Sequence, residues 1–329
     1  MGRTGKTDAT ETKAKGVRVI APDPNLVDKP LNKMEARYWS MIKPQAGTLF
    51  LKGKPGMAKS AILRTIASKL NMNYIHVNLA MISECDLGVY PIVDEYNGMR
   101  VLSFATPKWA AIANESPTLI NFEELNRCRQ VVQNACLQIL NERGIGMEFS
   151  FNDNAFMCSC GNEGESDDTS VEEFDRAMKT RLITQSHHLT VQEWIDGYAK
   201  DNVVPLIVNY LKNNAEEYYK AGAEGGKGDS FACPRTWTFL SKFIVANFGK
   251  DFKVAEIVPS LSESGCGYVG PAITKFVRYC ENMIKITIKD VMKDFDGSKE
   301  ILSTLGKDVY SELLSSLKAL DCKKFKDKR

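Results

Sequence analysis

The chain has 329 residues, and 43% of them are hydrophobic, which is enough to bury one large core or two smaller ones. Lysine and arginine together number 43 and aspartate and glutamate 41, so the net charge is only +2. A charge this small gives no whole-molecule field that could hold a polyanion, and the composition therefore disfavours a nucleic-acid partner without excluding one.

The first sixteen residues are polar and contain no apolar run. They lack the hydrophobic segment of a secretory signal, and we expect a disordered leader over residues 1–16. Downstream, no uninterrupted apolar segment is long enough to span a membrane. The nine cysteines are an odd number set mostly in apolar segments, which is typical of reduced thiols. These features predict a cytoplasmic protein that does not enter a membrane.

Short apolar segments alternate with helical patterns between residues 17 and 189. The expected strands are 48–52, 74–77, 118–122 and 156–158. Apolar residues at helical spacing follow Lys59 and recur between residues 131 and 140. Strands that alternate with helices predict a mostly parallel sheet covered by helices, and hence an α/β domain over residues 17–189.

Two expected β-hairpins interrupt this alternation. Asn97-Gly98 lies between the β-type segments 93–96 and 100–104, and both turn positions of such a hairpin need positive φ. Residues 147–151 alternate apolar and polar side chains and run into a turn at 152–154. Hairpins inserted in an α/β domain indicate a role other than packing of the hydrophobic core.

The pattern becomes helical after Leu189. A glycine-rich loop at 222–228 precedes a helix that opens at Pro234, since proline suits the first helical position. We expect a smaller, all-helical domain over residues 190–290. The remaining segment, 291–329, contains an amphipathic pattern at 311–320 and ends in basic residues typical of a solvated terminus.

A phosphate-binding loop is expected between the strand at 48–52 and the helix that follows it. Such a loop needs backbone N–H groups that point inward, a lysine for the β- and γ-phosphates, and a hydroxyl for Mg²⁺. The general pattern has glycine before the lysine, and alanine is a mild departure if that residue keeps a negative φ. The candidate nucleotide-binding residues are Gly53, Pro55, Gly56, Met57, Ala58, Lys59, Ser60 and Ala61.

Two carboxylates follow the strand expected at 118–122. An ATPase needs one carboxylate for hydrated Mg²⁺ and another to polarise the attacking water, both at a strand end beside the loop. Glu124 is the candidate base, and Ser60 and Glu123 are the candidate metal residues. Aspartate is usual where Glu123 stands, and the extra methylene could weaken or shift Mg²⁺ coordination.

These segments resemble one family. The sequence FEELNR at 122–127 is similar to the strand-end signature of MoxR-like AAA+ ATPases, in the dynein-related, helix-2-insert clade, and that branch also has alanine before the loop lysine. Segments 86–91 and 106–109 frame the first hairpin as the family's helix-2 insert does, and the second hairpin stands where its pre-sensor-1 insert lies. The resemblance covers roughly residues 31–247 and implies a P-loop AAA+ fold with a helical lid that binds ATP and Mg²⁺.

The resemblance also implies further site residues. Asn162, after the fourth expected strand, is similar to sensor 1, which orients the attacking water. Arg181 matches the arginine finger that a neighbouring subunit supplies, with Arg176 as the weaker candidate. Arg235, at the start of the helix after Pro234, looks like sensor 2. The catalytic set implied is Lys59, Glu124, Asn162 and Arg181.

This resemblance implies an ATPase that remodels, assembles or activates a protein partner, in this family often one with a von Willebrand A domain. It also implies a homo-oligomer, most simply a hexameric ring. Two alternatives stay open: a ring motor that acts on nucleic acid, and a nucleotide-dependent binding module with slow turnover. Glu123 and the segment Cys158-Ser159-Cys160, which is unlike the family's usual threonine-rich strand end, motivate the slow alternative.

Overall fold

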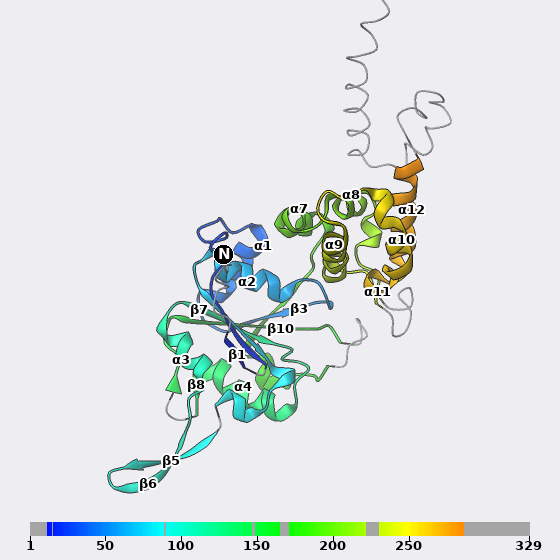
Figure 1. Ribbon diagram of the computed structural model, residues 1–329. Coiled ribbons are helices and arrows are strands. Elements are labelled where there is room, and N and C mark those ends of the chain that lie inside the picture. The colour runs from blue at the N-terminus through cyan, green and yellow to red at the C-terminus, as the bar shows by residue number, and fades with distance from the viewer. Residues whose placement is uncertain are drawn as a thin grey trace, which may run out of the picture. The chain divides into compact units, whose positions relative to one another are not determined.

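The computed structural model describes residues 12–14, 16–88, 90–146, 149–164, 171–221 and 230–285 (Figure 1). The chain divides into two compact units, Met1–His188 and Leu189–Arg329, and each is considered by itself. The glycine-rich loop expected at 222–228 and the helix expected at 311–320 lie outside the described residues.

The first unit is built on a seven-stranded sheet with the strand order β1-β2-β4-β7-β10-β3-β11. Neighbouring strands from β4 to β11 are parallel, whereas β1 and β2 are joined antiparallel at one edge. In sheet order the strands are Thr12–Ala14, Val17–Ile20, Asn73–Asn78, Thr118–Glu123, Ala155–Gly161, Thr48–Lys52 and Leu182–Ser186. The four strands expected from the sequence are all present, and those at 74–77, 118–122 and 156–158 extend beyond the predicted bounds.

Both faces of the sheet are buried, which explains the nearly continuous apolar runs of its strands. Leu49 and Leu51 of β3 pack on the side covered by α1 (Lys33–Ile42) and α2 (Lys59–Lys69). Phe50 points to the other side, which is covered by α3 (Lys108–Glu115) and α4 (Gln130–Glu142). Figure 1 shows these helices in layers on either side of the strands.

Part of the segment that was expected to be a disordered leader is a β-strand. Thr12–Ala14 forms β1 and pairs antiparallel with Val17–Ile20. Gly16, at φ 74°, allows the reversal between the two strands. The prediction was wrong here because backbone pairing with an existing sheet edge stabilises a polar strand that has no apolar pattern of its own.

The first expected hairpin is confirmed. Pro91–Tyr96 (β5) pairs antiparallel with Met99–Phe104 (β6), and the two turn residues, Asn97 and Gly98, have φ values of 51° and 76°. At the second hairpin, Gly144–Ile145 (β8) pairs with Phe149–Ser150 (β9). Short helices complete the described part of this unit: η1 (Leu79–Met81), η2 (Glu84–Leu87) and α5 (Arg176–Lys179).

In the second unit, regular structure in the described residues is helical. Its longer helices are α8 (Pro205–Asn213), α9 (Pro234–Phe248), α10 (Val254–Ser264) and α12 (Ala272–Lys285), joined by α6 (Val191–Trp194), η4 (Ile195–Ala199), α7 (Lys200–Asn202), η5 (Ala215–Glu217) and α11 (Cys266–Val269). The helix expected at Pro234 is confirmed, with proline in its first turn. The core of the second unit is aromatic: the ring centroids of Tyr210, Trp237 and Phe276 lie 5.0–5.9 Å apart.

Across the described ranges, no helix combines the length and the apolar character that a membrane crossing requires.

Candidate phosphate site

The candidate phosphate loop connects the carboxyl end of β3 to the start of α2. Gly53 packs so closely on the chain after β11 that an added Cβ would lie 2.7 Å from the carbonyl oxygen of His187. Gly56 has a φ of 73°. Ala58 caps α2 with a φ of 61°, so the condition under which alanine would be a mild departure, a negative φ, is not met. The loop needs a left-handed backbone conformation at the residue before Lys59. Alanine adopts this conformation at a cost in conformational free energy that glycine would not incur.

Lys59 is the first residue of α2, directly after the loop, and is 9% exposed. Its Nζ donates to the carbonyl oxygens of Gly53 and Lys54, at 2.6 and 2.9 Å, and to Oδ1 of Asn162, at 3.2 Å. These contacts hold the ammonium group inside the loop and join it to the end of β10.

Glu124 and Asn162 meet on the same edge of the sheet. Nδ2 of Asn162 donates to Oε2 of Glu124 at 3.4 Å, and Arg127 Nη1 donates to the same oxygen at 3.2 Å. Glu124 has a φ of 59°, a left-handed conformation that is costly for a non-glycine residue and is found mostly where function requires it. The structure therefore brings together three of the predicted residues, Lys59, Glu124 and Asn162.

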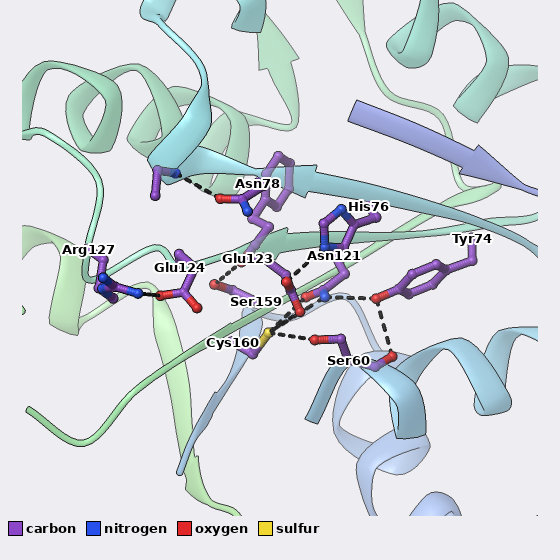
Figure 2. Close-up of polar contacts among 12 residues, drawn as sticks. Ser60, Tyr74, His76, Asn78, Asn121, Glu123, Glu124, Arg127, Ser159 and Cys160 are labelled. Carbon is purple, nitrogen blue, oxygen red and sulfur yellow. Dashed lines mark hydrogen bonds and ion pairs between the residues drawn. The ribbon is translucent and has the colours of Figure 1, made fainter. Parts of the chain in front are cut away.

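Figure 2 shows the corner formed by Ser60, Glu123 and Cys160. The Cys160 thiol lies 3.8 Å from Ser60 Oγ and 3.4 Å from Glu123 Oε1, so the two predicted metal residues converge on one sulfur. The other carboxylate oxygen of Glu123, Oε2, lies 2.8 Å from Nε2 of His76 on β4. Oxygen donors from a hydroxyl and a carboxylate are the kind that Mg²⁺ prefers.

The side chains behind this corner are neutral. Burial, and next the charge of Glu123, raise the pKa of the Cys160 thiol and that of the Tyr74 hydroxyl well above their usual values. Tyr74 accepts a hydrogen bond from Asn121 Nδ2 at 2.8 Å and donates to the Ser60 carbonyl at 3.4 Å. The Tyr74 hydroxyl and the Cys160 thiol thus stay protonated, and they form a neutral, hydrogen-bonded layer behind Ser60 and Glu123.

Sequence reasoning missed two buried residues that fix the site. Asn126 donates from Nδ2 to the Asn162 carbonyl at 2.8 Å and accepts from the Asn162 N–H at 3.3 Å. His187, fully buried, lies 2.8 Å from the Met57 carbonyl through Nε2 and 2.8 Å from the Tyr38 hydroxyl through Nδ1. Because a carbonyl only accepts, Nε2 donates and thereby ties the loop to the core.

The signals for these residues were present but weak. Asn126 belongs to the segment that carries the family resemblance, where it received no role. His187 directly follows the last strand of the sheet, as many site residues do.

The two candidate arginine fingers, Arg181 and Arg176, lie in the first unit but away from the phosphate loop. Arg181 precedes β11, and its carbonyl accepts from Thr48 N–H at the start of β3. It is therefore at the amino edge of strands whose carboxyl edge carries the phosphate loop, five residues or roughly 16 Å away. Arg181 lines a cavity of about 170 Å³ together with Thr48, Arg143 and Thr180. Arg176 is exposed at the start of α5.

Arg235 lies in the second unit, exposed in the first turn of α9. Trp237, Leu240 and Ile244 of the same helix are fully buried and form its core-facing side. Arg235 and the phosphate loop belong to separate units.

One family model matches the chain. Residues 48–196 match the family described as AAA domain (dynein-related subfamily). No curated protein matches the chain. Among solved structures, the Thermotoga maritima RuvB K64R mutant is similar at 13% identity over 75% of this chain and 69% of that chain, with a TM-score of 0.38. The T. maritima RuvB Holliday junction branch migration motor matches at 10% identity over the same shares, with a TM-score of 0.35.

The family match spans β3, the phosphate loop, the Glu123–Glu124 strand end, Asn162 and Arg181. The mostly parallel sheet, the loop between β3 and α2 and the two covered faces are those expected from the sequence. The chain thus has the AAA+ P-loop fold, and residues 48–196 are similar to the AAA domain of the dynein-related subfamily.

Proposed function

We propose that this protein is a MoxR-like ATPase that couples ATP hydrolysis to the remodelling, assembly or activation of a protein partner, and that it works as a ring, most simply a hexamer. The proposed ATPase activity is supported most directly by two hydrogen bonds that link Lys59, Asn162 and Glu124. Lys59 Nζ donates to Asn162 Oδ1 at 3.2 Å, and Asn162 Nδ2 donates to Glu124 Oε2 at 3.4 Å. A cation, a neutral amide and a carboxylate in this order suit a site that must neutralise a phosphate, orient a water and accept its proton.

ATP fits the loop on structural grounds. The start of α2 carries no side-chain cap, so its first N–H groups stay available for an anion, and the helix dipole favours negative charge there. Gly53 leaves the loop no room for a side chain against His187. Lys59 would hold the β- and γ-phosphates, and the loop residues from Gly53 to Ala61 would enclose them.

Mg²⁺ fits the corner of Ser60 and Glu123, because both offer oxygen atoms close to the same point, the Cys160 thiol. When bound, the ion would neutralise charge on the transferred phosphate. Glu124 would accept the proton of the attacking water, and Asn162 would hold that carboxylate through its amide.

A protein partner is supported by the β5–β6 hairpin. Val93, Tyr96, Met99 and Leu102 are 63–74% exposed, which gives this insert apolar side chains on both of its faces. In Figure 1 the hairpin extends away from the sheet. The net charge of +2 gives no comparable support to nucleic acid.

The ATPase is tested with three proteins: the unmodified chain, Lys59→Ala and Glu124→Gln. We expect the unmodified chain to hydrolyse ATP, Lys59→Ala to lose ATP binding, and Glu124→Gln to bind ATP without turnover. Turnover is measured as phosphate release and binding as equilibrium affinity. Undiminished hydrolysis by Glu124→Gln would refute the role of this base, and tight binding with negligible turnover in the unmodified chain would favour the slow binding module.

The partner class is tested with the ATP-bound Glu124→Gln protein. We expect it to retain a protein partner, and retention to fall when Val93 and Leu102 are both changed to serine. Filter binding to DNA and RNA at several salt concentrations is the counter-test. Binding that weakens steeply with salt, together with nucleic-acid-stimulated hydrolysis, would replace the protein partner with a nucleic-acid substrate.

A further inference from the structure

His76 has one hydrogen-bond partner among the described residues, and this partner is Glu123. Its Nε2 lies 2.8 Å from Glu123 Oε2, and the two side chains are only 20% and 16% exposed. Its second nitrogen, Nδ1, is buried with no hydrogen-bond partner in the described part of the chain. Because a carboxylate only accepts, Nε2 is the donor. The imidazole therefore orients the carboxylate and makes no other polar contact among these residues.

The sheet register explains why position 123 carries glutamate. His76 on β4 pairs with Asn121 on β7, and Asn78 pairs with Glu123, so His76 and Glu123 are diagonal neighbours on one face. Strand spacing and rise place such neighbours roughly 8 Å apart between Cα atoms. Aspartate would be one methylene, about 1.5 Å, shorter and would not reach the imidazole.

The hydrogen bond between His76 and Glu123 also determines which carboxylate oxygen of Glu123 faces the proposed metal position. His76 engages Oε2, and Oε1 lies against Cys160, whose thiol is in turn beside Ser60. Figure 2 shows His76 on the side of Glu123 away from Ser60. By holding Oε2, the imidazole restricts the rotamers of the Glu123 side chain and so reduces the rotamer entropy that this side chain would lose on metal binding.

We propose that His76 is a positioning residue for the metal side of the phosphate site: its Nε2–H holds one oxygen of Glu123 so that the other is directed to the Mg²⁺ bound with ATP. His76 and Glu123 together take the place of the usual aspartate. This inference rests on the proposed function, since it assigns a role within the same site. Partners of this kind, which hydrogen-bond a metal-binding side chain, typically change metal affinity 10–100-fold when removed.

The test measures binding, with hydrolysis suppressed by Glu124→Gln in every protein. A fluorescent ATP analogue is titrated in EDTA, and Mg²⁺ is then titrated at a fixed analogue concentration. We expect His76→Ala to raise the Mg²⁺ concentration at half-saturation about tenfold and to leave the affinity for the metal-free analogue unchanged. His76→Gln, which can place an N–H near the same carboxylate, should recover part of the loss.

Coupling is measured with Glu123→Asp. Aspartate cannot reach His76, so we expect Glu123→Asp to weaken Mg²⁺ binding and the added His76→Ala change to cause little further loss. His188→Ala, at an exposed histidine, is the matched control and should leave the Mg²⁺ titration unchanged.

Two results would overturn the proposal: a Mg²⁺ half-saturation in His76→Ala equal to that of the parent, or an equal loss of affinity with and without metal, which would indicate a purely structural role. Failure of the proposed function has a different signature. In that case the parent protein itself would bind the analogue neither in EDTA nor with Mg²⁺.

Discussion

Ala58 is the most strained residue of the phosphate loop. An L-residue in the left-handed conformation costs about 1–2 kcal/mol, whereas glycine adopts it freely but loses about 0.5–1 kcal/mol more backbone entropy on folding. With a φ of 61°, Ala58→Gly should therefore raise the free energy of unfolding by about 0.5–1 kcal/mol. Denaturant unfolding monitored by circular dichroism measures this difference.

Ala61→Gly is the matched control, because Ala61 is exposed in the first turn of α2, where glycine should lower the free energy of unfolding by about 0.5–1 kcal/mol. The same substitution three residues apart is thus expected to have opposite signs. A loss of stability in both proteins would show that Ala58 is not strained in solution.

At the scale of single residues, the sequence predicted those that belong to local motifs. Lys59 and Glu124 are predictable because each follows an apolar strand at fixed spacing, whereas Asn162 was implied by the family resemblance. His76, Asn126 and His187 were not found, since their contacts join residues 36–149 positions apart. A short sequence motif does not reveal contacts between residues that are this far apart in the chain.

Elements were predictable where their apolar pattern is strong. The strands 48–52 and 118–122 and the hairpin around Asn97-Gly98 have clear patterns and turn chemistry, and they are present in the structure. Strand Thr12–Ala14 has neither, because its stability comes from the partner strand beside it. The left-handed conformation of Ala58 was missed for a related reason: the loop that closes around Lys59 overrides the preference of an isolated alanine.

In the second unit, a buried carboxylate joins the short helix η5 to α12. Glu217 is fully buried, and its Oε1 lies 2.9 Å from Lys220 Nζ and 2.6 Å from Lys275 Nζ. Trp237 in the aromatic core donates to the Glu217 carbonyl at 3.1 Å. The ion pairs therefore anchor one end of the core of this unit.

The Glu217 ion pairs predict a pH dependence of stability. Burial raises the pKa of Glu217, but hydrogen bonds from Lys275 and Lys220 outweigh it and leave the pKa below its ordinary value of 4.5. A pKa lowered in the folded state means that the stabilisation is complete above about pH 4.5 and is lost as the pH falls further, through the folded-state pKa.

We expect Glu217→Gln to lower the free energy of unfolding at pH 7 by about 2 kcal/mol, as for hydrogen bonds to charged groups whose lysines are partly exposed. Thermal unfolding between pH 7 and pH 3 should show this difference shrinking below about pH 4.5. Glu216→Gln, at the exposed neighbour, should change stability by less than about 0.5 kcal/mol. A pH-independent difference at Glu217 would contradict the assignment.

For the whole molecule, the parallel sheet sets the main constraint on mechanism. The phosphate loop follows the carboxyl end of β3, and Arg181 precedes the amino end of β11, its parallel neighbour. The two sites cannot meet within one chain. If Arg181 is a finger, it completes the site of another copy, and the proposed ring is then a requirement for hydrolysis rather than an accessory to it.

This arrangement predicts that activity can be restored between two inactive proteins. Arg181→Ala should bind ATP yet lose about 10³–10⁵ in hydrolysis rate, the effect of an arginine finger in other P-loop enzymes. Lys59→Ala should be inactive because it does not hold ATP, although it still carries Arg181. In mixed rings, Lys59→Ala subunits would supply Arg181 to the intact phosphate sites of Arg181→Ala subunits, so phosphate release should reappear on mixing.

Arg176 is the second candidate for the arginine finger. If Arg181 is the main finger, Arg176→Ala should retain ATP hydrolysis. Loss of hydrolysis in Arg176→Ala together with normal hydrolysis in Arg181→Ala would transfer the role to Arg176. Unmixed Arg181→Ala that hydrolyses ATP at the original rate, or a turnover per chain that does not change on dilution, would exclude a site shared between copies.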